Sequence, residues 1–144
     1  MTAGWASVRE CHPSVWQATA VPGAWSAVDP PRFLTAWERH VVARLAPHAG
    51  HDAIGAIRVT DRCTCGCSSI GFSNVDHFPV AEAEAIDSDG TPIWVMLFAD
   101  RDEQTLATLD VLRADGQPIH ELPSVEQFAV SRTSVWAGSS SADE

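Results

Sequence analysis

The sequence predicts an α+β protein in which one N-terminal helix packs on a five-stranded antiparallel meander, behind an irregular Trp-rich N-terminal arm. Two observations predict this fold class. One segment, beginning at Asp29, repeats apolar residues with the period of a helix. The segments after it alternate apolar and polar residues or are continuously apolar, and turn residues separate them. With 144 residues, of which 45% are apolar, the chain can bury one core, so we expect one domain.

We expect the chain to divide into an arm over residues 1–28, a single α+β domain over residues 29–137 and a disordered tail over residues 138–144. The arm carries three of the six tryptophans, which are Trp5, Trp16 and Trp25. Because prolines and a glycine interrupt it without a helical or alternating period, we expect its aromatic side chains to dock on the domain. An arm that binds a partner is the alternative.

The helix is predicted from its punctuation and its apolar stripe. Asp29 suits the N-cap, and Pro30 and Pro31 suit the first turn, where a missing N–H costs nothing. The stripe recurs at three- and four-residue spacing through Leu34, Trp37, Val41 and Leu45. The helix should end at about Ala46, because Pro47 and Gly50 follow.

Five strands are predicted after the helix, over residues 57–62, 69–73, 80–86, 93–98 and 106–113. Asp89-Gly90 and Asp115-Gly116 are turn signals at the ends of strands. The segment DSDG, from Asp87 to Gly90, also resembles part of a calcium loop. It lacks the later bidentate glutamate of such loops, so a hairpin turn is the preferred interpretation. A last apolar patch, at Phe128 and Val130, follows a proline-containing loop.

The formal net charge of −10 and the absence of long apolar segments limit the kinds of partner that we expect. All nine basic residues are arginine, and 19 acidic residues outnumber them, so such a surface repels phosphate backbones and we expect no nucleic-acid partner. We expect no membrane partner and a cytoplasmic location, because neither a signal peptide nor 18 consecutive apolar residues occur. A basic protein partner would suit the charge, and a homo-oligomer stays open. No phosphate-binding loop or serine-elbow motif points to an enzyme.

Chemistry is predicted at the run CTCGC, where Cys63, Cys65 and Cys67 lie within five residues. In an extended strand their thiols would face one side at roughly 7 Å intervals, too far apart to share an ion. A bend at Gly66 lets the sulfurs converge on a metal with bonds of about 2.3 Å. In a reducing compartment this spacing favours metal or redox chemistry over a disulfide framework.

Zinc is the expected ion, and Cu(I), which tolerates two or three thiolates, is the competitor. Zinc needs a fourth ligand, for which His77 is nearest beyond the second strand of the hairpin. The alternatives are His48, His51, Cys11, His12, His40 and His120. We expect the metal to serve a structural or partner-docking purpose. The alternatives are an acidic protein of the immunity or inhibitor type and a thiol-disulfide redox protein in which Cys65 and Cys67 react.

From the helix onward, over roughly residues 31 to 128, the chain resembles a family of small uncharacterised proteins common in high-G+C bacteria. Its members carry a motif close to RCxCGCPS, an apolar-LE-apolar strand before an Asp-Gly turn, and a late ELP element. The matching residues here are Arg62, Cys63, Cys65, Gly66, Cys67 and Ser69, then residues 109–116, then residues 121–123. Ser68 stands where proline is usual, and Asp110 replaces the usual glutamate. The resemblance implies the fold and the importance of the cysteines, and no activity.

Overall fold

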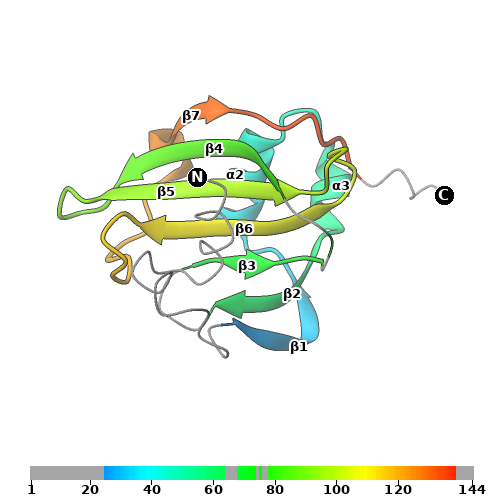
Figure 1. The fold of residues 1–144 in the computed structure, drawn as a ribbon, viewed down its shortest axis with the longest axis horizontal. Helices are drawn as coiled ribbons and strands as arrows, with labels where there is room; N and C mark the ends of the chain where they lie inside the picture. The colour runs from blue at the N-terminus through cyan, green and yellow to red at the C-terminus, as the bar shows by residue number, and fades with distance from the viewer. Residues whose placement is uncertain (1–24, 64–67, 74, 76–77, 139–144) are drawn as a thin grey trace.

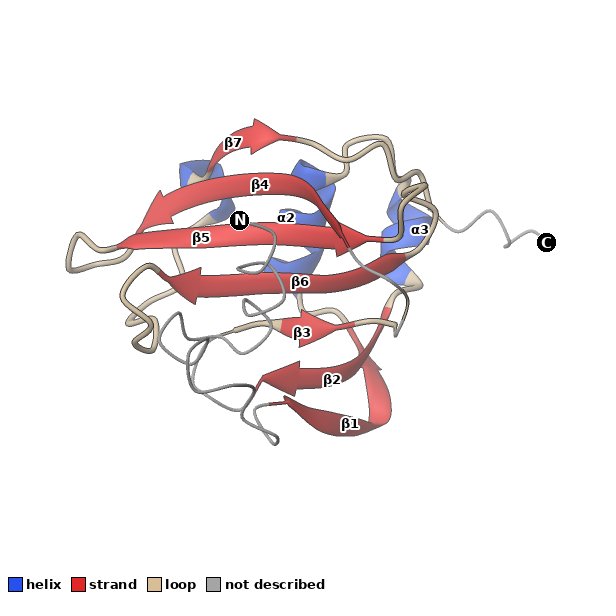
Figure 2. Ribbon diagram, in the orientation of Figure 1, coloured by secondary structure: helices blue, strands red, loops and turns tan. Residues whose placement is uncertain are grey.

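The computed structural model describes residues 25–63, 68–73, 75 and 78–138, and these residues form one antiparallel sheet with two short helices on one of its faces (Figure 1). Most of the described chain is strand and connecting loop (Figure 2). The helices are α2 (Ala36–Leu45) and α3 (His51–Gly55), with a 3-10 helix, η2 (Val125–Gln127), near the end. The strands are β1 (Trp25–Phe33), β2 (Arg58–Cys63), β3 (Ile70–Gly71), β4 (Phe78–Ile86), β5 (Pro92–Ala99), β6 (Leu106–Arg113) and β7 (Ala129–Arg132).

The predicted fold class is wrong in its balance of helix and sheet and in the order of the strands. The described residues form a seven-stranded sheet with the order β1-β2-β3-β6-β5-β4-β7, in place of a five-stranded meander. Strands β4, β5 and β6 do follow one another as predicted, but β3 pairs with β6 and not with β4. Turn signals identify the hairpins, whereas the pairing of one hairpin with another depends on packing across the whole sheet.

The predicted start of the helix is also wrong, because Asp29, Pro30 and Pro31 belong to β1. Among the described strands, this one lies at an edge of the sheet and pairs with β2 alone, and its register shifts between Ala27 and Arg32. Proline is tolerated at such an irregular edge, where its missing N–H interrupts no ladder. Trp25, which the prediction placed in the arm, is the first residue of β1. Residues 1–24, with Trp5 and Trp16, lie outside the described residues.

Helix α2 begins at a capping box that the prediction overlooked. The Thr35 hydroxyl accepts a hydrogen bond from the Glu38 amide at 3.2 Å, and Glu38 Oε1 accepts one from the Thr35 amide at 2.8 Å. Arg32 donates to both oxygens of the same Glu38 carboxylate, at 2.9 and 3.1 Å. These bonds satisfy amides that the first turn of any helix leaves without partners, and they join the helix to the end of β1.

The main core lies between α2 and the sheet. Val42 and Leu45 of α2 and Val95, Leu97 and Leu109 of the sheet are fully buried in one cluster. A smaller cluster on the opposite face contains Met96, Phe98, Ala107 and Leu112, and in β5 Met96 and Phe98 alternate with Val95 and Leu97 of the main core. Strand β6 is therefore buried on both faces. Among the described residues, no helix is long and apolar enough to cross a membrane.

The end of the described chain closes the sheet and anchors α2. Strand β7, which the prediction treated only as an apolar patch, pairs with β4 and forms the second edge. Beyond it, the Ser134 amide donates to the Leu45 carbonyl at 2.7 Å, and Trp136, 4% exposed, donates through Nε1 to the Gln104 carbonyl. Residue 138 is the last described one, and the remainder of the predicted tail lies outside the description.

Candidate functional site

The cysteine run lies in the connection of a hairpin, as the sequence predicts. Strands β2 and β3 pair antiparallel, with Arg62 opposite Ile70, and the Cys63 amide donates to the Ser69 carbonyl at 3.1 Å. This bond closes the hairpin around residues 64–68. The described ends of β2 and β3 therefore lie side by side, whereas residues 64–67, with the predicted bend at Gly66, lie outside the described residues.

Of the four predicted metal ligands, the structure describes one. Cys63 is the last residue of β2, is 3% exposed and is bonded in a disulfide. Cys65, Cys67 and His77 lie outside the described residues, and so does the other half of that disulfide. Within the described part of the chain, no group of three histidine, cysteine or carboxylate ligand atoms includes Cys63.

The base of the hairpin is tied to the buried strand β6. The Ser68 amide donates to the Val111 carbonyl at 3.2 Å, and the Ser69 hydroxyl accepts from the Val111 amide at 2.9 Å. Ser69 is 1% exposed and Asp110, beside Val111 in β6, is 0% exposed. The pairing of β3 with β6 thus brings Ser69 of the cysteine motif close to Asp110 of the strand motif. About forty residues separate the two in the sequence.

A second polar site lies at the end of β6, around Arg113. Its Nη1 donates to Asp87 at 2.9 Å and to Asp89 at 3.0 Å, both in the turn between β4 and β5. Its Nε and Nη2 donate to the two carboxylate oxygens of Asp115, at 3.0 and 2.6 Å, and Nη2 also donates to the Thr91 hydroxyl. The arginine side chain is 5% exposed, so one buried cation joins two turns at the same end of the sheet.

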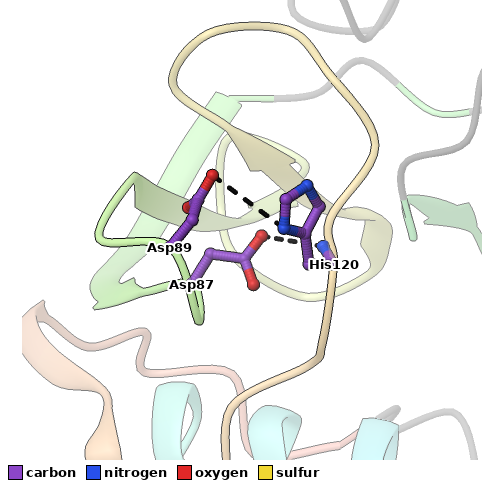
Figure 3. A group of neighbouring side chains, drawn as sticks. All are labelled: Asp87, Asp89 and His120. Atoms are coloured by element: carbon purple, nitrogen blue, oxygen red, sulfur yellow. Dashed lines mark hydrogen bonds and ion pairs between the residues drawn. The ribbon is translucent and has the colours of Figure 1, made fainter.

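Asp87 connects the same site to the loop that follows. One of its oxygens accepts from the backbone amides of Ser88 and Glu121, and the other accepts from Arg113 and from the backbone amide of His120 at 2.7 Å (Figure 3). Four donors therefore surround a carboxylate whose side chain is 0% exposed. The His120 ring lies beside Asp89, with 3.9 Å between Nδ1 and the nearest carboxylate oxygen.

The pKa shifts at this site follow from these bonds. Burial acts to raise the pKa of Asp87, but the hydrogen bonds from His120, Arg113, Ser88 and Glu121 outweigh it and hold that pKa well below its usual range. The side-chain hydrogen bonds from Arg113 lower the pKa of Asp115 to about 2. Bonds to Asp115 and Asp87 raise the pKa of Arg113 above its ordinary value. The site is therefore ionised throughout the physiological range.

We call this arrangement of Arg113, Asp87, Asp89 and Asp115 the clasp, because it joins two turns of the chain. It is a poor cation site. Oxygens of Asp87 and Asp89 and a nitrogen of His120 lie within 4.8 Å of one another, a spacing that could hold a metal ion. Arg113 already contacts both carboxylates, and the remaining lone pairs of Asp87 accept from backbone amides. The predicted hairpin turn is present at this segment, since the Gly90 amide donates to the Asp87 carbonyl.

Both Asp-Gly turns are predicted from the sequence, but the role of Arg113, which joins them, was not predicted. The signal was present in the predicted order of β4, β5 and β6, because a meander brings the β4–β5 turn and the end of β6 to one end of the sheet. An arginine at that strand end, between two aspartate-containing turns, should have suggested an ion pair. The ELP element, Glu121 to Pro123, contributes to the clasp because the Glu121 amide donates to Asp87. It also contacts α2, since the Trp37 indole N–H donates to the Pro123 carbonyl.

The chain matches the model of a domain of unknown function (DUF6984) over residues 31–123. This range runs from the end of β1 to the ELP element, so it includes α2, the cysteine hairpin and the clasp around Arg113. Neither the curated proteins nor the solved structures contain a match.

Proposed function

The chain belongs to the DUF6984 family, and we propose that its cysteine hairpin binds a thiophilic metal ion, with zinc the first candidate and Cu(I) the second. The observation that carries the proposal is the closure of the hairpin by the Cys63–Ser69 backbone bond. The two other cysteines of the run belong to the short connection between β2 and β3. The ion serves a structural or partner-docking purpose.

The surroundings of Cys63 support thiolate binding. Cys63 is 3% exposed, so little water reaches its sulfur. Low exposure to water strengthens the attraction between a thiolate and a cation. The disulfide at Cys63 requires another sulfur within bonding reach in the oxidised chain. The same proximity in the reduced chain allows two thiolates to share one ion. His77 is the proposed fourth ligand, because it follows β3 in the connection to β4.

Metal content tests this proposal directly. Chain purified in reductant and without chelator should carry about one zinc or copper ion, as measured by elemental mass spectrometry. The variant Cys65→Ser/Cys67→Ser should lose the ion, and Cys11→Ser, which removes a thiol outside the run, should retain it. His77→Ala should weaken binding, whereas His48→Ala should not. Absence of metal together with three freely titrating thiols in the reduced run would refute the proposal.

A thiol-disulfide function is the second candidate, and the disulfide at Cys63 is the observation that favours it. A working disulfide exchanges with the cellular thiol pool, whereas structural disulfides have reduction potentials below about −300 mV. Equilibration with glutathione buffers, followed by alkylation and intact-mass measurement, gives this potential. A potential between about −200 and −270 mV would support exchange, and a value below about −300 mV would assign the bond a purely structural role.

A further inference from the structure

A groove between α2, α3 and the ends of β1 and β2 gathers positive charge on a chain whose net charge is −10. Its volume is about 620 Å³. Two arginines and two histidines line it, Arg39 and His40 from α2, His51 from α3 and Arg58 from β2. Asp52 is the one acidic residue among the described residues that line it. Basic side chains therefore outnumber acidic ones in this groove, whereas acidic residues outnumber basic ones in the whole chain.

The two guanidinium groups are held in place without using carboxylates. Arg58 stacks on the Phe33 ring, with 3.8 Å from Cζ to the ring centroid, and Phe33 and Arg58 are register partners in β1 and β2. Arg58 Nη1 also donates to the Ala56 carbonyl, and Arg39 Nη1 donates to the Leu34 carbonyl at 3.0 Å. Such contacts orient a planar donor before a ligand arrives, which lowers the entropy lost on binding.

The ion pairs between described residues are made by Arg32, Arg113 and His120, so Arg39 and Arg58 have no carboxylate partner in the described part of the chain. The bonds just given occupy one nitrogen of each guanidinium and leave Nε and Nη2 for a ligand. In a chain with twice as many acidic as basic residues, two such arginines in one groove indicate an external anion.

The same groove offers apolar contact. Phe33 is 57% exposed and lines the groove together with Ala43, Ile54 and Ala56. A second hollow of about 580 Å³ lies beside it, and Asp52, Ala56 and Arg58 line both. The further lining of this second hollow is mainly apolar and includes Ile57, Phe72, Leu106 and Trp136. A ligand with its charge at Arg58 could therefore place an apolar body in either direction.

We propose that this groove binds a small organic anion, a phosphate or carboxylate attached to an aromatic or aliphatic body. The anionic group accepts hydrogen bonds from Arg39 and Arg58, and the imidazoles of His40 and His51 supply further N–H donors. The apolar body covers the exposed ring of Phe33. This proposal is independent of metal binding at the cysteine hairpin, because the groove contains none of the proposed metal ligands.

The test uses the full chain and records ¹H–¹⁵N correlation spectra during titration with phenyl phosphate. We expect saturable shifts in the amides of α3 and Arg58. Inorganic phosphate should bind more weakly, phenylacetate should also bind because it shares charge and ring, and benzyl alcohol, which lacks charge, should produce no shifts there. Absence of saturable shifts with phenyl phosphate, or equal shifts with benzyl alcohol, would overturn the proposal.

Variants separate a built site from general attraction of anions. Arg39→Gln and Arg58→Gln should each weaken phenyl phosphate binding about tenfold, the loss expected for a hydrogen bond to a charged group. Arg101→Gln is the matched control, because Arg101 also stacks on an aromatic ring, that of Phe78, but lies outside the groove. An equal loss in Arg101→Gln would overturn the proposal. The spectra report directly whether each variant is folded, and Arg39→Lys preserves the charge where glutamine does not fold.

Discussion

Arg113 is the residue through which one end of the sheet is held together. Its guanidinium contacts three aspartates that belong to two different turns, and the most buried of them, Asp87, accepts two further bonds from the loop after β6. Removing one partner of a buried ion pair leaves the other charged and without solvent, which is far more harmful than losing an exposed pair. The three carboxylates should therefore differ in importance according to their burial.

Asparagine substitution should destabilise the fold most at Asp87 and less at Asp89 and Asp115. The Asp87 side chain is 0% exposed, and an amide there would direct an NH2 group toward backbone donors, whereas Asp89 and Asp115 are 38% and 43% exposed. We expect Asp87→Asn to lower the melting temperature several times more than Asp89→Asn, as measured by circular dichroism. Equal effects of the two substitutions would contradict the clasp.

The clasp should make stability depend on acidity below about pH 4. The pKa values of Asp87, Asp89 and Asp115 are lower in the folded chain than the value of 3.8 that each would have unfolded. The unfolded chain consequently binds more protons in this range, so their contribution is complete above about pH 4 and is lost as the pH falls toward the folded pKa, about 2 for Asp115. Urea midpoints measured from pH 5 to pH 2 should fall, and less steeply in Asp87→Asn/Asp115→Asn.

At the scale of single elements, α2 depends on its first turn. The Thr35 and Glu38 side chains each satisfy an amide of the other, and Arg32 holds the glutamate from β1. Because the helix has only ten residues, it cannot persist without caps and packing. Thr35→Ala should cost about 1 kcal/mol in the free energy of urea unfolding, while Thr35→Ser keeps a hydroxyl acceptor and should cost much less. Identical losses would show that the hydroxyl does not matter.

The hairpin that carries the cysteines depends on a glycine opposite an aspartate. Gly71 and Asp61 are register partners in β3 and β2, and a methyl group on Gly71 would overlap the Asp61 carboxylate. Gly71→Ala should therefore cost about 1–3 kcal/mol, the usual effect of overpacking. In an Asp61→Ala background the same change should cost much less, which a double-mutant cycle measures. An additive cycle would rule out this contact as the cause.

At the scale of the whole molecule, the C-terminal segment closes the core over α2 and the β5–β6 connection. Ser134 joins Leu45 to Glu103, since its amide donates to the first and its hydroxyl to the second, and Trp136 packs in the main core. The segment therefore connects parts of the chain that are about sixty residues apart. Neither its burial nor its partners could be inferred from its polar, short sequence.

Two tryptophans test the contribution of this closure. Trp136 is 4% exposed, and Trp94, on β5, is 41% exposed. Trp136→Ala should cost about 3–5 kcal/mol in the free energy of unfolding, because it removes a large buried side chain and its hydrogen bond. Trp94→Ala should stay near the small effect typical of surface changes. Far-UV circular dichroism in urea gives both values without relying on the fluorescence of the substituted residue.

Several elements were predicted correctly because their signals are local. The bounds of β6 were predicted to the residue, and the hairpin at the cysteines and the two Asp-Gly turns were predicted because turn chemistry acts between neighbours. For the candidate site, this locality sufficed to place Cys63 in the hairpin. It did not supply a further ligand from the described residues.

Which of these elements meet depends on packing across the folded core. Pro30 and Pro31 fit both a first helical turn and an irregular edge strand, and pairing with β2 selected the strand. The addition of β7, the pairing of β3 with β6, the clasp around Arg113 and the arginines of the groove all join residues distant in the chain. Such contacts arise from packing over the whole core, and no local pattern encodes them.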